Sequence, residues 1–443
     1  MNRCIYILKV WLLAALCGLA SCDVHFEDVE VLGTNECEHT IVMYLMADNN
    51  LSFSIYHNAL DAEMGMIGAL PSVRLVIYLD RADKTELYEV RYLSYGDGQH
   101  IRTCRTLKTY PWQNSTDPAV MRGVMEDVKR LAPSKSYGLV MSGHGAGWFP
   151  TPSSGTAYHN QKVAPKSGAE FWFPAGEMNE PHTRFLGYDY EEEADGRRVA
   201  SYISTEGIVS GLQPIHFDYI IFDACFMSSV EFLYEMRHSA DYIVASPVEI
   251  MACGLPYREI VANLATPKHN LPSVCDIAMD VYMRDDSFSY EKSLALAVVD
   301  CSKLEALADV VGRVYRSVGG DDHLQVLKQR VDRSNVQHLD RMSPAAFYDL
   351  KDFVFELTDD ESLRGEFCAA MDEAVIHSVH TDSIYSLGYQ SSMDYNYDYI
   401  TPIGGAESLA LCGVSTYIPF AEAPLTNSLY LQTEWGRKIY SKE

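Results

Sequence analysis

The stretch Ile220-Ile221-Phe222-Asp223-Ala224-Cys225-Phe226-Met227-Ser228-Ser229 decides the fold, together with Ser142-Gly143-His144-Gly145-Ala146-Gly147-Trp148. Each begins at or just after an apolar run that is typical of a buried strand, so a Cys and a His each come where a strand ends. In an open parallel sheet, the carboxyl ends of the strands form the edge where ligands bind. The pattern therefore predicts that His144 and Cys225 meet at this edge.

Further apolar runs recur along the chain with helical patterns between them. Asp117 is placed to cap a helix over 118–131, because Pro118 suits the first helical position. The runs 87–93 and 101–107 predict a hairpin. The alternation predicts an α/β sandwich with a mainly parallel sheet, whereas the Tyr- and Asp-rich stretch 391–399 is interpreted as a surface loop. The other strand candidates are 40–46, 73–79, 137–141, 217–222, 242–245, 294–299 and 412–418, and the other helix candidates are 59–69 and 228–237.

A Cys beside a His supplies a nucleophile and a general base. The imidazole promotes formation of the thiolate and then protonates a departing amine. Because the neighbours of His144 are glycines, backbone can approach a substrate there, and the amides of Gly145 and Cys225 are candidate oxyanion donors. Asp223 lies two residues before Cys225 and would share its face in an extended segment. The alternatives are a buried core Cys and an Asp that caps the local loop.

The N-terminal 21 residues have the layout of a secretory signal, since Arg3 and Lys9 precede or flank an apolar stretch too short for a membrane span. They lead to Leu19-Ala20-Ser21-Cys22, which resembles the lipobox of bacterial lipoproteins and makes Cys22 the expected lipidation site. An ordinary cleaved signal is the alternative. Residues 22–38 are expected to form an acidic tether, and the chain is expected to be a cell-envelope lipoprotein, periplasmic or surface-exposed on the outer membrane of a Gram-negative bacterium.

Composition excludes some classes of function. The net charge of −26 argues against a nucleic-acid partner. Eleven cysteines are scattered without a CxxC pair, so no metal site is expected, and any disulfide pairing stays open. We expect a core over 39–300 with a Pro-containing insertion at 149–198, followed by C-terminal helices and late strands over 301–443 that complete or flank it as a smaller α/β extension.

The two motifs together resemble those of the clostripain family of cysteine peptidases, which have a caspase-like fold. Segments 41–51, 184–189 and 240–257 also resemble family segments, and the resemblance is diffuse beyond about residue 257. It implies a caspase-haemoglobinase-like three-layer α/β/α sandwich. It also implies a cysteine endopeptidase that cleaves after Arg or Lys through a thioester acyl-enzyme.

In that family, the residues matching His144 and Cys225 form the catalytic dyad, and the residue matching Asp223 lies in the S1 pocket. The implied partners are peptide or protein substrates that contain Arg or Lys. The lipid anchor would in addition attach the protein to a membrane. No cofactor is expected, and calcium dependence stays open because no EF-hand-like loop locates a site. The resemblance further implies self-cleavage after a basic residue of the insertion, where the candidates are Lys162, Lys166, Arg184, Arg197 and Arg198.

Two other functions fit parts of the sequence. A non-catalytic surface lipoprotein would use the same fold as a binding module, but both catalytic groups are present. A caspase-like peptidase with a preference for Asp or Asn, such as a legumain relative, is the second. Asp223 argues against it, because a pocket carboxylate would repel an acidic P1 side chain.

Overall fold

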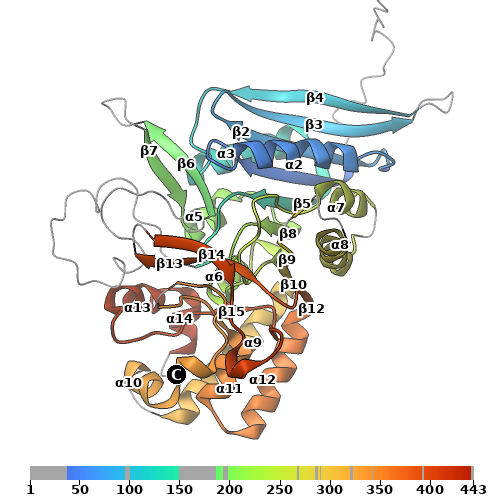
Figure 1. Cartoon of the computed structure of the whole chain (residues 1–443). Coiled ribbons are helices and arrows are strands. Elements are labelled where there is room, and N and C mark those ends of the chain that lie inside the picture. Colours follow the sequence, from blue (N-terminus) through green and yellow to red (C-terminus); the bar gives the residue numbers. More distant parts are fainter. Residues whose placement is uncertain are drawn as a thin grey trace, which may run out of the picture. The chain divides into compact units, whose positions relative to one another are not determined.

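The central sheet has nine strands, in the order β12-β10-β9-β8-β5-β1-β2-β3-β4 (Figure 1). They are β1 (Cys37–Met46), β2 (Val73–Arg81), β3 (Lys84–Ser94), β4 (His100–Tyr110), β5 (Ser134–Ser142), β8 (Phe217–Asp223), β9 (Ala240–Ala245), β10 (Ala295–Asp300) and β12 (Val375–His380). The five middle strands, from β9 to β2, are parallel. Antiparallel pairs flank them, with β10 and β12 at one end and the predicted β3–β4 hairpin at the other. The predicted mainly parallel α/β fold is thus confirmed.

The computed structural model describes residues 37–94, 100–148, 186–192, 198–266, 269–284, 288–289, 291–319, 323–342, 344–391 and 394–440. The expected signal peptide, Cys22 and most of the tether lie outside these residues, as do four of the candidate processing sites, Lys162, Lys166, Arg184 and Arg197. Within the described part, no helix has the length and apolar character needed to cross a membrane. All eight cysteines described there are free thiols.

Helices cover both faces of the sheet and make three layers. Side chains of β1 alternate between two hydrophobic cores, as a strand covered on both faces requires: Ile41 and Met43 face one, Val42 and Tyr44 the other. The first core is closed by α2 (Ser52–Gly65), α7 (Tyr257–Leu264) and α8 (Leu271–Arg284). The second is closed by α3 (Pro118–Leu131), α5 (Thr205–Gly211), α6 (Val230–Met236), α9 (Leu304–Val318), α10 (His323–Arg330), α11 (Leu350–Leu357), α12 (Glu361–Ala374), α13 (Pro424–Tyr430) and α14 (Glu434–Ile439).

The C-terminal third of the chain contributes to both the central sheet and the second hydrophobic core. It supplies β12 to the central sheet and the helices from α9 onward to the second core. Short 3₁₀ helices and three two-stranded sheets complete the described structure. These are η2 (Cys301–Lys303), η3 (Arg333–Asn335) and η4 (Ile403–Gly405), with β6 (Leu186–Glu192) on β7 (Arg198–Ile203), β11 (Tyr348–Asp349) on β15 (Ser415–Thr416), and β13 (Tyr385–Ser391) on β14 (Asp394–Tyr399).

Two predictions for the C-terminal region are wrong. The run 412–418 does not enter the central sheet, and only β15 forms there. Its backbone instead binds the loop that follows Cys225, because the Ser415 amide donates to the Ser228 carbonyl at 2.9 Å. The stretch 391–399 is not simply a loop, since β14 pairs with β13. The rings of Tyr385 and Tyr397 stack with centroids 5.4 Å apart, and cross-strand aromatic contacts of this kind stabilise a hairpin.

Candidate active site

The register of two neighbouring strands brings the His and Cys loops together. β5 and β8 are parallel neighbours, and their last paired residues are Ser142 and Asp223. His144 and Cys225 each lie two residues beyond that pair, so they leave the sheet side by side at its carboxyl edge. The Gly143 amide donates to the Asp223 carbonyl at 3.4 Å and holds the two exits together.

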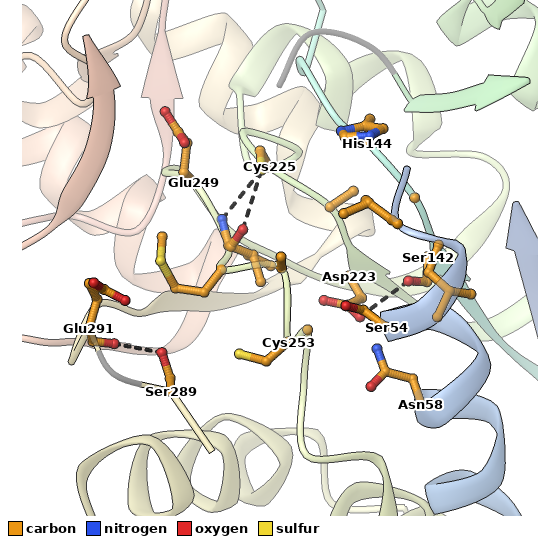
Figure 2. A pocket seen from close by; sticks show the side chains of 18 of the residues that line it. Ser54, Asn58, Ser142, His144, Asp223, Cys225, Glu249, Cys253, Ser289 and Glu291 are labelled. Atoms are coloured by element: carbon orange, nitrogen blue, oxygen red, sulfur yellow. Dashed lines mark hydrogen bonds between the residues drawn. The ribbon is translucent and has the colours of Figure 1, made fainter. Parts of the chain in front are cut away.

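The two residues line one cavity of about 560 Å³ (Figure 2). The exposed fraction is 7% for His144 and 8% for Cys225. Both residues are thus largely buried, and both form part of the cavity lining. Figure 2 shows Cys225 and His144 on one rim, and Asp223 near Ser142. The structure therefore brings together every site residue predicted for the dyad and the S1 pocket. The cavity lining also includes Phe288, Ser289, Glu291, Tyr385 and Tyr397.

Backbone contacts hold the thiol of Cys225 in place. Its Sγ lies 3.4 Å from the Ile250 amide, which donates to it, and 3.7 Å from the Ile250 carbonyl. The next residue, Phe226, has a φ of +61°, a left-handed conformation that costs an ordinary L-residue about 1 kcal/mol. The Phe226 amide donates to the Val248 carbonyl at 3.0 Å, and this bond stabilises the sharp turn that follows the sulfur.

Burial raises the pKa of the Cys225 thiol well above its usual range, and the carboxylates of Glu249 and Asp223 raise it further. The resting thiol is therefore protonated at neutral pH. A general base is needed to remove its proton, because the surroundings alone do not produce a thiolate.

His144 is held from two sides. Its Nε2 lies 2.8 Å from Oδ1 of Asn50, so with that oxygen accepting, Nε2 carries the ring proton and Nδ1 is the basic nitrogen. The His144 carbonyl accepts from the Gly187 amide at 2.9 Å, which attaches the first residues of β6 to the His loop. Sequence analysis assigned no role to Asn50, although it lies in the Asn-rich segment 41–51.

Gly145 packs directly against the backbone of Cys225. A Cβ atom at position 145 would lie 2.4 Å from the Cys225 carbonyl oxygen and 2.7 Å from its nitrogen, so only glycine fits here. Among the described residues, neither the Gly145 amide nor the Cys225 amide donates to a backbone carbonyl. The two residues predicted to supply the oxyanion donors thus lie against each other.

Asp223 is a buried carboxylate with one satisfied oxygen. Its Oδ2 accepts from the Tyr257 hydroxyl at 2.6 Å and the Ser142 hydroxyl at 3.3 Å. Its Oδ1 is buried without a hydrogen-bond partner in the described structure. Burial raises the pKa of this carboxyl to about 6, while Tyr257, the Leu255 amide and Ser142 oppose the rise. A buried acceptor without a donor is rare in native proteins and points to a ligand that supplies one.

Glu249 connects the β13–β14 hairpin, which supplies Tyr385 and Tyr397 to the cavity lining, to the segment beside Cys225. It is buried, and its Oε1 accepts from the Ser386 hydroxyl at 2.7 Å and from the Leu387 amide at 2.9 Å. It therefore holds the β13–β14 hairpin next to the segment that carries Ile250. This residue was also missed by sequence analysis.

Comparison with known families fits this geometry. The model of the clostripain family matches residues 172–419, which is more than half of the chain. The chain belongs to the clostripain family. It is accordingly a cysteine-type peptidase. The family match includes Asp223 and Cys225 and extends well beyond residue 257, where the resemblance of the sequence motifs becomes diffuse.

Solved structures of clostripain-family (C11) proteases resemble this fold. An inactive zymogen C11 protease from Parabacteroides distasonis is 23% identical, with a TM-score of 0.70, covering 92% of this chain and 99% of that one. A secreted C11 cysteine protease from Bacteroides thetaiotaomicron, iotapain, is 25% identical, with a TM-score of 0.68 and coverage of 91% and 100%. A secreted C11 cysteine protease from the same organism, in complex with an irreversible peptide inhibitor, is 25% identical, with a TM-score of 0.69 and coverage of 91% and 98%. No curated protein matches the chain.

Proposed function

We propose that this clostripain-family peptidase is an endopeptidase that cleaves after Arg or Lys, with Cys225 as nucleophile and His144 as general base and acid. One observation carries the proposal: the register pair Ser142–Asp223 delivers a thiol, an imidazole and a buried carboxylate to a single cavity. The orphaned Oδ1 of Asp223 supports a basic P1 side chain, since a guanidinium or ammonium group would supply the missing donor.

In the acylation step, His144 Nδ1 takes the proton from the Cys225 sulfur as the sulfur attacks the scissile carbonyl carbon. The carbonyl oxygen becomes an oxyanion, to which the amides of Gly145 and Cys225 donate. The imidazolium then gives its proton to the leaving amine, and the C–N bond breaks to leave a thioester. Asn50 keeps the imidazole in the required tautomer throughout.

Deacylation follows the same route in reverse order. A water molecule loses a proton to His144 and attacks the thioester carbon, and the sulfur leaves and regains the proton. The new carboxyl terminus then departs with its Arg or Lys side chain.

The P1 cation also favours ionisation of the nucleophile. The charge of Asp223 contributes to the raised thiol pKa, so a guanidinium beside this carboxylate offsets part of that effect. A basic P1 residue is thus expected to raise kcat as well as lower KM.

A P1-diversified library of fluorogenic peptides tests this function. We expect cleavage after Arg and Lys at least about 100-fold above cleavage after any neutral or acidic residue, because one buried charge pair is formed only with a basic side chain. A preference for Asp or Asn would overturn the proposed specificity but not the peptidase assignment. Absence of all cleavage by processed protein would favour a binding module.

The pH dependence of this preference tests the role of Asp223. Its carboxyl has a pKa of about 6, so at pH 5 roughly one site in ten is ionised, whereas at pH 7.5 nearly all are. We expect the ratio of kcat/KM for P1 Arg over P1 citrulline to rise about tenfold from pH 5 to pH 7.5. Because kcat/KM reports the ionisation of the free enzyme, titration of the dyad is the same for both substrates and cancels in this ratio. A ratio that is flat across this range would exclude Asp223 as the P1 partner.

A further inference from the structure

A second cluster of reactive side chains lies at the opposite edge of the sheet from Cys225. His39 is near the start of β1, Asp218 is near the start of β8, and His269 comes from the segment between α7 and α8. Parallel strands place their amino ends together, so the first two are near neighbours across β5. Among the described residues, this is the group of three metal-binding side chains whose ligand atoms all lie within 4.8 Å of one another.

The carboxylate of Asp218 lies between the two imidazoles. Its Oδ2 is 3.4 Å from Nε2 of His269 and 4.0 Å from Nδ1 of His39. The two rings pack against each other with centroids 4.2 Å apart. His39 is almost fully buried, with 3% exposed, while the side chains of His269 and Asp218 are 20% and 37% exposed. The cluster is therefore reachable from solvent on one side.

The surroundings fix the orientation of the His39 ring. Its Nε2 lies 3.1 Å from the Tyr219 hydroxyl and its Nδ1 lies 2.7 Å from the Ser136 hydroxyl. The Tyr219 ring occupies the space above Gly138, where a Cβ atom would lie 2.0 Å from the ring. With the Tyr219 oxygen accepting, Nε2 carries the ring proton and the lone pair of Nδ1 accepts from the Ser136 hydroxyl, with the Asp218 carboxylate 4.0 Å away on the same side of the ring. An outer hydrogen bond of this kind is the usual support of a metal-binding histidine.

His269 is held less completely than an ordinary buried histidine. Its Nε2 faces Asp218, whereas its Nδ1 is buried without a hydrogen-bond partner in the described structure. The structure thus places this ring by its contact with the carboxylate and by packing alone. Its Nε2 is therefore aimed at the shared carboxylate, where an ion coordinated by Asp218 would also meet it.

We propose that His39, Asp218 and His269 form a zinc site. Two imidazole nitrogens and one carboxylate oxygen are a common zinc ligand set, and a water or the Ser136 hydroxyl would complete a tetrahedron. Zn–ligand bonds of about 2.0 to 2.1 Å put neighbouring ligand atoms about 3.3 Å apart. The separation of Asp218 and His269 already matches this value, whereas the His39 nitrogen, 4.0 Å from Asp218 and within 4.8 Å of the His269 ligand atom, must move closer to both. The ion would connect β1, β8 and the segment before α8, far from the catalytic edge.

Zinc titration by calorimetry tests the site. The full chain is used with Cys225→Ala, so that the catalytic thiol and imidazole do not bind the ion. We expect one Zn²⁺ per chain, and we expect His269→Ala and Asp218→Asn each to weaken binding at least about 100-fold, since each removes one of three protein ligands. His269 is partly exposed and Asp218→Asn is isosteric, so circular dichroism should show both variants folded.

His377→Ala is the matched control. His377 also pairs with one carboxylate, Asp276, at 2.8 Å, but no second histidine of the described part of the chain completes that pair. We expect its zinc affinity to equal that of the parent, and we expect Zn²⁺ to raise the melting temperature of the parent and the control but not of His269→Ala. No binding by the parent, undiminished binding by His269→Ala, or equal losses in His269→Ala and His377→Ala would each overturn the proposal. None of these results bears on cleavage after Arg or Lys.

Discussion

Replacing Cys225 with alanine is expected to reduce kcat/KM for a P1 Arg peptide by at least about 10⁴-fold, because it removes the sulfur that forms the acyl-enzyme in the proposed mechanism. Loss of the sulfur removes only its two long contacts with the Ile250 backbone, at 3.4 and 3.7 Å, and sulfur is a weak hydrogen-bonding partner. The variant should therefore melt close to the parental temperature and still bind an uncleaved P1 Arg substrate. Initial rates and active-site titration with an irreversible peptide inhibitor provide the measurement.

Cys104→Ser is the control for this loss. Cys104 lies on β4, is exposed, and is remote from the cavity lining, so its replacement should leave kcat/KM within about twofold. Full activity in Cys225→Ala would move the nucleophile elsewhere, and Cys253, which also lines the cavity, would be the next candidate. Loss of activity in both variants would point to general thiol damage instead.

The meeting of His144 and Cys225 was predictable because it depends on one rule of parallel sheets. Two consecutive motifs at strand exits lie at the same edge, and the register pair of β5 and β8 places them at equal distances beyond it. The helix 118–131 was also predicted with its observed bounds, since Asp117 accepts from the Ala119 amide and Pro118 fits the first turn. Here local sequence alone determines the structure.

The supports of the site were not predictable, because backbone groups and distant segments provide them. Ile250 holds the sulfur through its amide and carbonyl, and these groups exist in every residue. Ser228 in the nucleophile loop donates its hydroxyl to the Gly413 carbonyl at 2.7 Å, nearly two hundred residues later in the chain. The apolar pattern of that late run, 412–418, predicts a strand of the sheet. Such a pattern indicates that a segment is buried, but it does not indicate which segment it packs against.

The start of α2 was missed for a related reason. The helix begins at Ser52, seven residues before the predicted start, and its N-cap Leu51 makes no side-chain cap. The turn before it is held by Asn49, whose side chain bonds the Met46 carbonyl and the Leu51 amide. This turn also positions Asn50 against His144. The helix therefore begins after a turn that serves the active site, without the capping side chain by which a helix start is usually predicted.

Replacing Asp223 with asparagine is expected to remove the preference for basic P1 residues while leaving the dyad intact. We expect kcat/KM for P1 Arg to fall about 100- to 1000-fold, the usual effect of breaking a buried charge pair. For P1 citrulline, which has the same shape without the charge, the fall should be below about threefold. The four rate constants form a cycle in which the coupling between the P1 charge and residue 223 is measured directly.

Stability distinguishes this effect from a structural one. Because the folded-state pKa of Asp223, about 6, exceeds the ordinary 3.8, the native state binds this proton more tightly, and the stabilising contribution is lost as pH rises through 6. At pH 7.5 the buried charge therefore costs roughly 3 kcal/mol, and asparagine avoids that cost. The variant should melt at or above the parental temperature at pH 7.5.

The exposed Asp241→Asn, which lies outside the cavity, should change neither selectivity nor cleavage rate. If P1 Arg and P1 citrulline lose activity equally in Asp223→Asn, the carboxylate supports the loop, and the P1 partner must be another group of the cavity.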